Sequence, residues 1–544
     1  MTTNLRVLFA LILFFFSSQA FAQLKSGRVI LIGIDGMSTE GFQVANLPNI
    51  YGLIQQGALS MKTRGVMPTV SAPNWSTITM GAGPEQTGIT KNGWTIKNHT
   101  ITATVMDKEG YFPSIFTLIR QQNPKAKTAF FYDWDALADL YNLKNINKVE
   151  FSDLQEKTFE KAIPYILDER PDFVFLYIGF PDEMGHEYGH GTTEYISALQ
   201  AVDTQIGRLI NKLKMNGLLD VYDIMVVTDH GMVGKNHGGE SMIELEVPWL
   251  ICGPGVIRNK MIDQPNDLMN TSPTILYILG LKQPDEWIGR PVYGAFAGTE
   301  QSKANTRTFV PRPIPSLKSG IYLEKQDLRF TSNLDGATIR YSLTGKRPDA
   351  KAPVYKNPVP LTKTTDVIAV ATLNGNESEE TVFNFIKIDG IKAVVMNQEM
   401  SDRYPGNGPL SLVDGVMGAS DFHDPSWIGF HGNNLDVVID FGSERKIKKL
   451  ALDCFSKESA WIFLPQSVEF YKSNDGKEFI LVTQGKEKNI AGAKNDGSHL
   501  FSADFPEIKT RYLRVIGTNI GICPPGHPGK GEKAWLFVDE VVVK

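Results

Sequence analysis

The stretch that decides the fold of the first half of the chain is Arg28-Val-Ile-Leu-Ile-Gly-Ile-Asp35, an apolar run that ends at an acidic residue. Two later stretches, Phe173 to Ile178 and Asp223 to Asp229, have the same character. Strands that are apolar on both faces are typical of parallel sheets covered by helices. Helical patterns at Gln155 to Leu167 and Tyr195 to Met215 separate these strands. We therefore expect an α/β domain with a largely parallel sheet and helices on both faces.

Acidic and histidine side chains follow the three predicted strands. Asp35, Asp182 and Asp229 come at or shortly after their carboxyl ends, where such sheets bind ligands, and four of the nine histidines fall between His186 and His237. Carboxylates balance the charge of a cation, and neutral imidazoles favour zinc over calcium or magnesium. Asp182 and His186 are four residues apart and share one face if their segment is helical. The pattern therefore predicts a metal site at this sheet edge.

A hydroxyl-bearing segment, Met67-Pro-Thr-Val-Ser-Ala-Pro-Asn-Trp75, precedes a helix that we expect to begin near Asn74. The N-terminus of a helix offers backbone N–H donors and the positive end of its dipole, which suits an attacking oxygen and an anionic group. A serine in this place is also a common N-cap. The pattern alone leaves Ser71 open as a nucleophile or as a cap.

Length and composition limit the remaining choices. The 544 residues suggest three or four domains, and 42% hydrophobic with 21% charged residues excludes a disordered or collagen-like chain. The net charge is only -5, so the chain has no overall positive field for a nucleic-acid scaffold. The three cysteines are too few for a disulfide framework and fit no CxxC motif. Whether Cys454 and Cys523 pair is left open.

Residues 1–22 have the pattern of a cleavable signal peptide, with Arg6 before an apolar run and Ala20-Phe-Ala22 as the cleavage site. We therefore expect an exported protein, periplasmic or extracellular. No later stretch reaches the roughly 20 apolar residues that span a bilayer, so we expect no transmembrane segment. The expected domains are a catalytic domain at 23–300, a polar, proline-containing linker at 301–315, and two all-β modules at 316–389 and 390–544.

The first half of the chain contains an ordered set of motifs: Asp35-Gly, Leu47-Pro-Asn-Ile, Pro68-Thr-Val-Ser-Ala-Pro-Asn74, Gly88-Ile through Asn92, Pro181-Asp-x-x-Gly-His186 and Thr228-Asp-His-Gly-Met232. Together these motifs resemble the type I phosphodiesterase/nucleotide pyrophosphatase branch of the alkaline phosphatase superfamily. The resemblance covers residues 27–300 and implies an alkaline phosphatase-like fold and metal-dependent hydrolysis of phosphoric esters.

The resemblance also implies roles for individual residues and two zinc ions, with manganese as an alternative. The ligands implied for one ion are Asp35, Asp229 and His230, and those for the other are Asp182, His186 and, as the best match for a later histidine, His237. Ser71 is then the nucleophile that forms a phosphoenzyme, and Asn92 contacts the phosphate. His190 is left as a substrate contact.

The sequence departs from the family at the nucleophile. Nucleotide pyrophosphatases usually have Thr followed by Phe, which helps to form the nucleotide slot, whereas this chain has Ser71-Ala72. Sulfatases of the superfamily carry C/S-x-P-x-R, and here Trp75 replaces the arginine. Our interpretation is a phosphodiesterase that acts on glycan-linked, nucleotide or other small phosphate esters. Alternatives are a phosphomonoesterase, a sulfatase-like hydrolase and, from another class, a glycan-binding protein with an inactive hydrolase domain.

The second half resembles two known modules. Gly336 to Pro348 and the following strands are similar to the Ig-like module of chitobiases, which we interpret as a spacer. Residues 390–544 resemble the coagulation factor 5/8 type C (discoidin) module, a galactose-binding-like jelly roll. Such modules often bind carbohydrate and hold a structural calcium ion, for which Asp414 and Glu540 are the candidate ligands. Aromatic side chains such as Trp427 could stack on a sugar face, although a core position is more common for them.

Overall fold

The computed structural model describes residues 27–303, 308–422, 424, 426–487 and 496–544, so the predicted signal peptide lies outside the described residues. The chain divides into two compact units. The first comprises Met1–Arg312, Ser332–Ala337 and Ala371–Glu379, and the second Pro313–Thr331, Thr338–Val370 and Glu380–Lys544. Across the described ranges, no helix has both the length and the apolar character needed to cross a membrane.

The first unit is built on a nine-stranded sheet with the order β4-β3-β5-β1-β6-β7-β2-β8, in which β9 also pairs with β2. β1 pairs in parallel with both β5 and β6, so the three strands predicted from the sequence are neighbours. β7 runs antiparallel to β6 and β2, which makes the sheet mixed. The strands are β1 Val29–Ile34, β2 Gly57–Arg64, β3 Thr128–Tyr132, β4 Lys148–Phe151, β5 Phe173–Ile178, β6 Asp223–Val227, β7 Glu246–Cys252, β8 Lys260–Met261 and β9 Asn266–Asp267.

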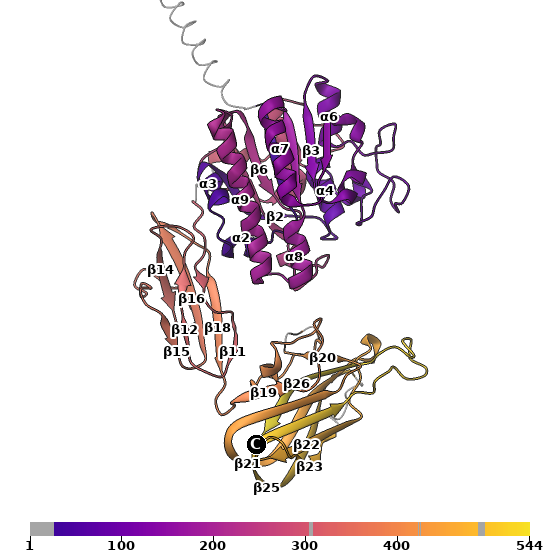
Figure 1. Cartoon of the computed structure of the whole chain (residues 1–544), viewed down its shortest axis with the longest axis vertical. Coiled ribbons are helices and arrows are strands. Elements are labelled where there is room, and N and C mark those ends of the chain that lie inside the picture. The colour runs from indigo at the N-terminus through magenta and orange to yellow at the C-terminus, as the bar shows by residue number, and fades with distance from the viewer. Residues whose placement is uncertain (1–26, 304–307, 423, 425, 488–495) are drawn as a thin grey trace, which may run out of the picture. The chain divides into compact units, whose positions relative to one another are not determined.

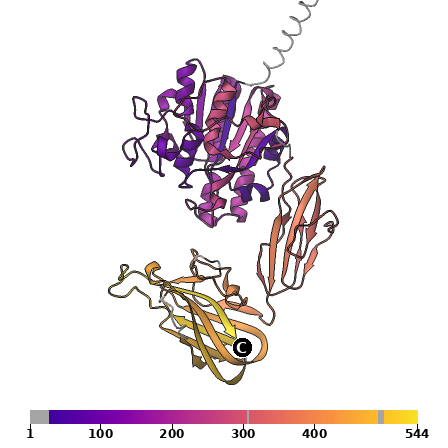
Figure 2. The same ribbon diagram turned by 180° about the vertical axis from the view of Figure 1, so that it is seen from behind.

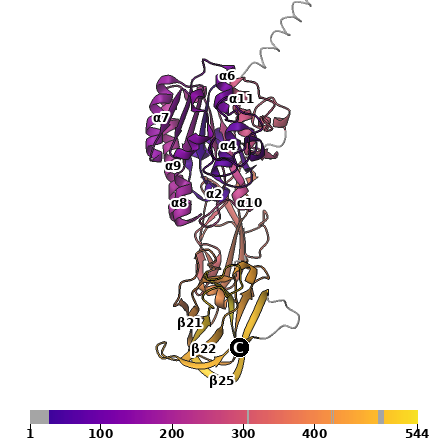
Figure 3. The same cartoon turned by 90° about the vertical axis from the view of Figure 1, so that its right-hand side faces the viewer.

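Helices cover both faces of this sheet, as predicted (Figure 3). Alternate residues of β1 enter two separate cores: Val29 and Leu31 pack with one set of helices, and Ile30 and Ile32 with the other. This two-sided burial explains why the strand is apolar throughout. One face carries α4 Ser71–Met80, α6 Ile115–Gln122 and α11 Thr271–Leu279, and the other α2 Thr39–Val44, α3 Pro48–Gln56, α7 Gln155–Glu169 and α9 Thr193–Met215. Shorter helices are α5 Pro84–Thr87, α8 Phe180–Tyr188 and α10 Met242–Leu245.

The carboxyl ends of β1, β5 and β6 lie at one edge of the sheet because these strands are parallel and in register (Figure 1). Asp35 follows β1 directly, Gly179 and helix α8 follow β5, and Thr228-Asp229 follow β6. The fold therefore brings together residues that are almost 200 positions apart in the sequence.

The C-terminal region consists mainly of β-strands (Figure 2). Its smaller part has a five-stranded sheet and two strand pairs, and its larger part has one eight-stranded sheet. The strands of the smaller part are β10 Ile314–Pro315, β11 Gly320–Tyr322, β12 Gln326–Leu328, β13 Phe330–Thr331, β14 Thr338–Ser342, β15 Val359–Leu361, β16 Thr365–Leu373, β17 Asn376–Glu377 and β18 Thr381–Lys387. Those of the larger part are β19 Ala393–Met396, β20 Ile428–His431, β21 Leu435–Ser456, β22 Ser467–Ser473, β23 Ile480–Gln484, β24 Lys486–Glu487, β25 Gly497–Thr518 and β26 Trp535–Val543.

The structure answers two questions about the C-terminal module that the sequence left open. Trp427 is only 1% exposed and its indole N–H donates to the carbonyl oxygen of Ala419, so its suggested role in stacking on a sugar is wrong and the core position holds. Cys454 and Cys523 are both free thiols. They lie in different hydrophobic clusters, Cys454 in the main core of this sheet and Cys523 beside Phe463.

Candidate metal centre

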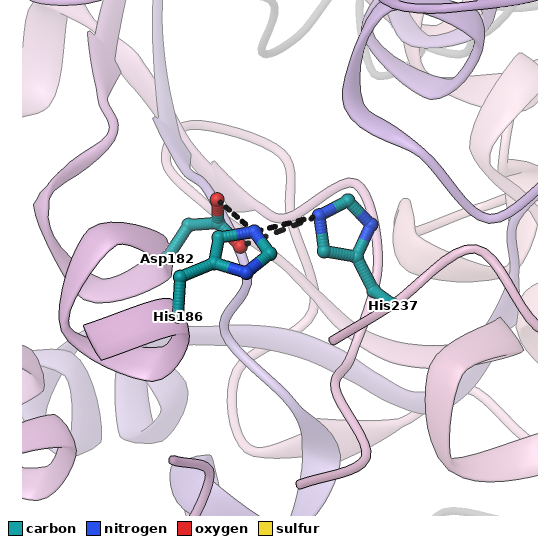
Figure 4. A group of neighbouring side chains, drawn as sticks. All are labelled: Asp182, His186 and His237. Atoms are coloured by element: carbon teal, nitrogen blue, oxygen red, sulfur yellow. Dashed lines mark hydrogen bonds and ion pairs between the residues drawn. The ribbon is translucent and has the colours of Figure 1, made fainter. Parts of the chain in front are cut away.

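One group of metal-binding side chains joins helix α8 to the loop that follows β6. Asp182 and His186 lie one turn apart on α8, with His186 Nε2 3.4 Å from Asp182 Oδ2 and 3.1 Å from His237 Nε2 (Figure 4). The Nδ1 atom of His186 is 2.8 Å from the carbonyl oxygen of Lys235, and that of His237 is 2.9 Å from the carbonyl oxygen of Thr69. These carbonyls orient both rings, which leaves each Nε2 facing the shared centre.

A second group lies deeper, at the ends of β1 and β6. His230 Nε2 is 3.4 Å from Asp35 Oδ1 and 3.1 Å from Asp229 Oδ2. Ligand atoms of Asp35, Asp182 and His230 all lie within 4.8 Å of one another, as do those of Asp182, His186 and His237. Asp182 therefore belongs to both groups. The six residues that the sequence suggested as ligands converge on one place.

Three carboxylate oxygens in this centre are buried and have no hydrogen-bond partner: Asp35 Oδ1, Asp182 Oδ1 and Asp229 Oδ2. A buried carboxylate oxygen without a partner is costly, so most such atoms in proteins are hydrogen-bonded or bind a cation. The three oxygens belong to the same groups as the imidazoles. Mixed carboxylate and imidazole donors suit zinc, and the residues present therefore fit a pair of such ions.

The electrostatics of the centre also favour a bound cation. Burial, followed by the charges of neighbouring carboxylates, raises the pKa values of Asp35 and Asp229 well above their usual range. Burial also opposes ionisation of Asp182, but the hydrogen bond with His186 and the nearby imidazoles together lower its pKa. The contact with Asp182 raises the pKa of His186 to about 9, whereas burial lowers that of His230 to about 3. The carboxylates repel one another, and a bound cation would relieve this repulsion.

Ser71 lies beside the deeper group. It is the first residue of α4, so the helix begins three residues earlier than we expected from the sequence. Pro73 is compatible with this start because the first turn of a helix leaves its N–H groups without helical partners. Val70 occupies the N-cap position, and the Ser71 Oγ atom lies 3.3 Å from His230 Nε2. The hydroxyl therefore faces the metal groups and does not cap the helix.

The segment before Ser71 is held by two side chains. The Asn74 side chain accepts from the Val66 N–H at 2.8 Å and donates to the carbonyl oxygen of Val70 at 3.0 Å. Thr69 Oγ1 donates to the carbonyl oxygen of Gly239 at 2.8 Å. The Asn74 bonds hold the segment's own backbone, and the Thr69 bond ties it to the loop that carries His237.

The two remaining candidates of this domain are Asn92, which lies next to Ser71, and His190, which does not belong to either group of candidate ligands. Asn92 Oδ1 accepts the N–H of Ala72 at 2.8 Å, which places its amide group next to Ser71. His190 lies outside both metal groups: its Nε2 is 2.6 Å from Ser38 Oγ, and its ring packs against Tyr195.

Sequence reasoning missed two residues that contact the centre, Trp75 and Tyr177. The Trp75 indole N–H donates to Asp35 Oδ2 at 2.9 Å, and the Tyr177 hydroxyl donates to the same oxygen at 2.5 Å. Both side chains are buried. In the sequence they look like ordinary core aromatics, one on a helix and one inside an apolar strand. Ser71 and Trp75 share a helix face only because α4 begins at Ser71, three residues before the expected start.

The candidate calcium ligands Asp414 and Glu540 belong to a C-terminal carboxylate cluster that also includes Asp453 and Asp539. Glu540 Oε2 accepts from the Gly415 N–H at 3.1 Å. Burial raises the pKa of Glu540 to about 8 and that of Asp539 to about 7, with the other acids of the cluster adding to both shifts. Asp453 Oδ2 and Asp539 Oδ1 are buried and have no hydrogen-bond partner. The sequence had not pointed to these last two residues.

Three regions of the chain match models of known protein families. Residues 29–247 match the family model described as type I phosphodiesterase/nucleotide pyrophosphatase, residues 317–384 that of the chitobiase/beta-hexosaminidase C-terminal domain, and residues 396–529 that of the F5/8 type C domain. The part of the chain that holds the sheet and the Asp/His groups thus matches the type I phosphodiesterase/nucleotide pyrophosphatase branch of the alkaline phosphatase superfamily. Two all-β regions that match the other two models follow it.

Individual relatives share this first domain. Ectonucleotide pyrophosphatase/phosphodiesterase family member 3 of Bos taurus is 32% identical over 224 residues, 38% of this chain and 25% of that protein. Venom phosphodiesterase of Macrovipera lebetinus is 31% identical over 235 residues, 40% of this chain and 27% of that protein. The chain thus spans about a quarter of the length of these relatives. The solved structure of murine ectonucleotide pyrophosphatase/phosphodiesterase 5 with AMP is 16% identical, with a TM-score of 0.42, and covers 47% of this chain and 96% of that one.

Proposed function

We propose that this chain is an exported, zinc-dependent phosphodiesterase that acts through a phosphoserine at Ser71. One observation carries the proposal: the Ser71 hydroxyl, not engaged as a helix cap, lies 3.3 Å from His230 Nε2 beside three buried carboxylate oxygens without partners. The family match of residues 29–247 and the phosphodiesterase names of the relatives support this choice of reaction.

Two sets of side chains would hold the ions. The set nearest Ser71 is Asp35, Asp229 and His230, and the other is Asp182, His186 and His237. When bound, the pair of ions lowers the pKa of the attacking hydroxyl and stabilises charge on the attacking and leaving oxygens. The low pKa of His230, caused by its burial, keeps its imidazole neutral and able to act as a ligand.

The chemistry of the chain's own residues follows from their positions. The Ser71 Oγ attacks phosphorus and gives up its proton, a new O–P bond forms, and the bond from phosphorus to the leaving oxygen breaks, so that the proton ends on the released alcohol. Water then breaks the bond between the Ser71 Oγ and phosphorus, which releases a phosphate monoester and restores the Ser71 hydroxyl. The Asn92 side-chain oxygen is occupied by the Ala72 N–H, so its NH2 end is the donor that we assign to a phosphate oxygen. The start of α4 adds the positive end of a helix dipole beside the phosphate.

We extend the proposal to the rest of the chain. Removal of residues 1–22 after export would leave a mature N-terminus near Gln23, which N-terminal sequencing of the secreted protein tests. The F5/8 type C module would bind carbohydrate and hold one calcium ion through Asp414 and Glu540. Glycan-linked or nucleotide phosphate esters are the substrates that we propose.

The decisive experiment compares three chromogenic substrates on the purified protein: bis-p-nitrophenyl phosphate, p-nitrophenyl phosphate and p-nitrophenyl sulfate. We expect the highest kcat/KM for the diester and about two zinc ions per chain. Preference for the monoester or for the sulfate would replace the phosphodiesterase assignment with a phosphomonoesterase or a sulfatase. Absence of both zinc and turnover would favour a glycan-binding protein with an inactive domain.

A further inference from the structure

The two oxygens of the Asp35 carboxylate have different surroundings. Oδ2 accepts two hydrogen bonds, from the Trp75 indole at 2.9 Å and from the Tyr177 hydroxyl at 2.5 Å. Oδ1 has no hydrogen-bond partner and lies 3.4 Å from His230 Nε2. One oxygen is therefore fully occupied by protein donors, and the other is left for a ligand.

Trp75 lies on the same helix as Ser71, the proposed nucleophile. It lies one turn after Ser71 on α4, so both side chains lie on the side of the helix that faces the ends of β1 and β6. Its ring packs edge-on against Tyr177, with centroids 5.2 Å apart. Gly33, in β1, makes room for the ring, because a Cβ there would lie 2.6 Å from Trp75 Cζ3. The indole is thus fixed between the nucleophile helix and the strand that carries Asp35.

We propose that Trp75 is a positioning residue that ties the nucleophile helix to the metal ligand Asp35 and, together with Tyr177, restricts Asp35 to binding through Oδ1. This inference rests on the proposed zinc site. Without the two donors, the carboxylate could turn or present both oxygens to the ion. Without the Trp75 bond, the start of α4 loses its direct link to the ligand, and the Ser71 hydroxyl loses its fixed distance to the centre.

The test compares Trp75→Phe with Trp249→Phe as the matched control. The Trp249 indole is also fully buried in the same core and donates its one hydrogen bond to Thr271 at 3.0 Å, and not to a candidate metal ligand. Both changes remove one ring and one N–H. Titration with zinc alone in a chelator-buffered series gives the free zinc at half occupancy. We expect Trp75→Phe to raise this concentration by about 10- to 100-fold and Trp249→Phe to leave it unchanged.

Tyr177→Phe provides a second variant that removes only the hydroxyl, with Tyr222→Phe as its control because the Tyr222 hydroxyl donates to Pro171 at the opposite edge of the sheet. We expect Tyr177→Phe to weaken zinc binding by a similar factor. At saturating zinc, Trp75→Phe should lower kcat more than it changes KM, because the Ser71 helix is displaced from the centre.

The outcomes separate this inference from the proposed function. A wild-type protein that binds no zinc overturns the proposed function and this inference with it. A wild-type protein that binds two zinc ions, with unchanged affinity in Trp75→Phe and Tyr177→Phe, overturns only the positioning role. If Trp75→Phe does not fold, the zinc affinity of Tyr177→Phe decides the result.

Discussion

The candidate metal centre of the first domain and the C-terminal carboxylate cluster both bury acidic side chains, but different groups surround them. In the first, three imidazoles and a serine hydroxyl lie beside the carboxylates. In the second, backbone N–H groups such as those of Gly415 and Val416 contact the acids. Carboxylate and imidazole together suit zinc, whereas oxygen donors alone suit calcium. The two sites therefore differ in the neighbours of their acids, which favour zinc in the first and calcium in the second.

The largest effect expected in the first centre is that of Ser71→Ala. Loss of the hydroxyl removes the nucleophile, so we expect turnover of the diester to fall by more than about 1,000-fold while the protein still binds two zinc ions. Steady-state kinetics and metal analysis of the same preparation measure both quantities. Ser76→Ala, in the same helix but bonded only to the carbonyl oxygen of Pro73, is the control and should keep its activity. Activity that survives in Ser71→Ala would exclude this residue as the nucleophile.

The next largest effect is expected on zinc content when Asp182, which belongs to both groups, is replaced. Because Asp182 belongs to both groups and His186 to one, we expect His186→Ala to retain about one zinc ion and Asp182→Ala to retain less. Metal analysis after dialysis measures the difference. His431→Ala, a histidine that stacks on Trp535 in the C-terminal sheet, is the control and should retain both ions. Equal zinc contents in the first two variants would contradict a shared role for Asp182.

The sequence predicts much of this centre because its ligands follow strands that are apolar throughout, and parallel strands bring their carboxyl ends together. The start of α4 was misplaced because Ser-Ala-Pro reads as a break, although proline is acceptable in the first turn. Trp75 and Tyr177 could not be found because they reach Asp35 across 40 and 142 residues of sequence. Asp453 in the C-terminal carboxylate cluster was missed for the same reason: only the pairing of β21 with β26 brings it close to Asp539 and Glu540. Asp539 directly precedes Glu540 in the sequence, where nothing distinguishes it from an ordinary strand residue.

We expect the C-terminal carboxylate cluster to bind calcium and not zinc. Calcium added to chelator-treated protein should raise the melting temperature of the C-terminal module by about 3 °C, because a ligand that binds only the folded state stabilises it. Glu540→Gln should abolish the rise, whereas Glu478→Gln, at an exposed position in the same module, should keep it. Calorimetry with each ion separately makes this measurement. An equal response to zinc would remove the distinction between the two clusters.

The smallest effect concerns Asp133, a carboxyl that follows β3 and accepts the Gly179 N–H at 2.7 Å. Burial raises its pKa from 3.8 to about 7. The folded state then holds this proton more tightly than the unfolded state, so the stability from this group is complete below about pH 4 and is lost as the pH rises to about 7. Asp133→Asn keeps the acceptor and removes the charge. We expect its free energy of unfolding to exceed that of the wild type by roughly 2 to 4 kcal/mol at pH 8 and by little at pH 4.

Urea unfolding of the zinc-loaded protein at both pH values tests this expectation. A difference between the two proteins that does not depend on pH would show that the Asp133 carboxyl ionises normally in the folded state.

The glycine at position 33 has a consequence for the history of this domain. A side chain there would overlap the Trp75 ring and would also come within 3.0 Å of Phe175. Residues 33 and 75 are therefore constrained as a pair: a bulky aromatic at 75 requires glycine at 33, and a side chain at 33 requires a smaller residue at 75. Among related sequences we therefore expect these two positions to co-vary. A substitution at position 75 in helix α4 should be accompanied by a substitution at position 33 in strand β1.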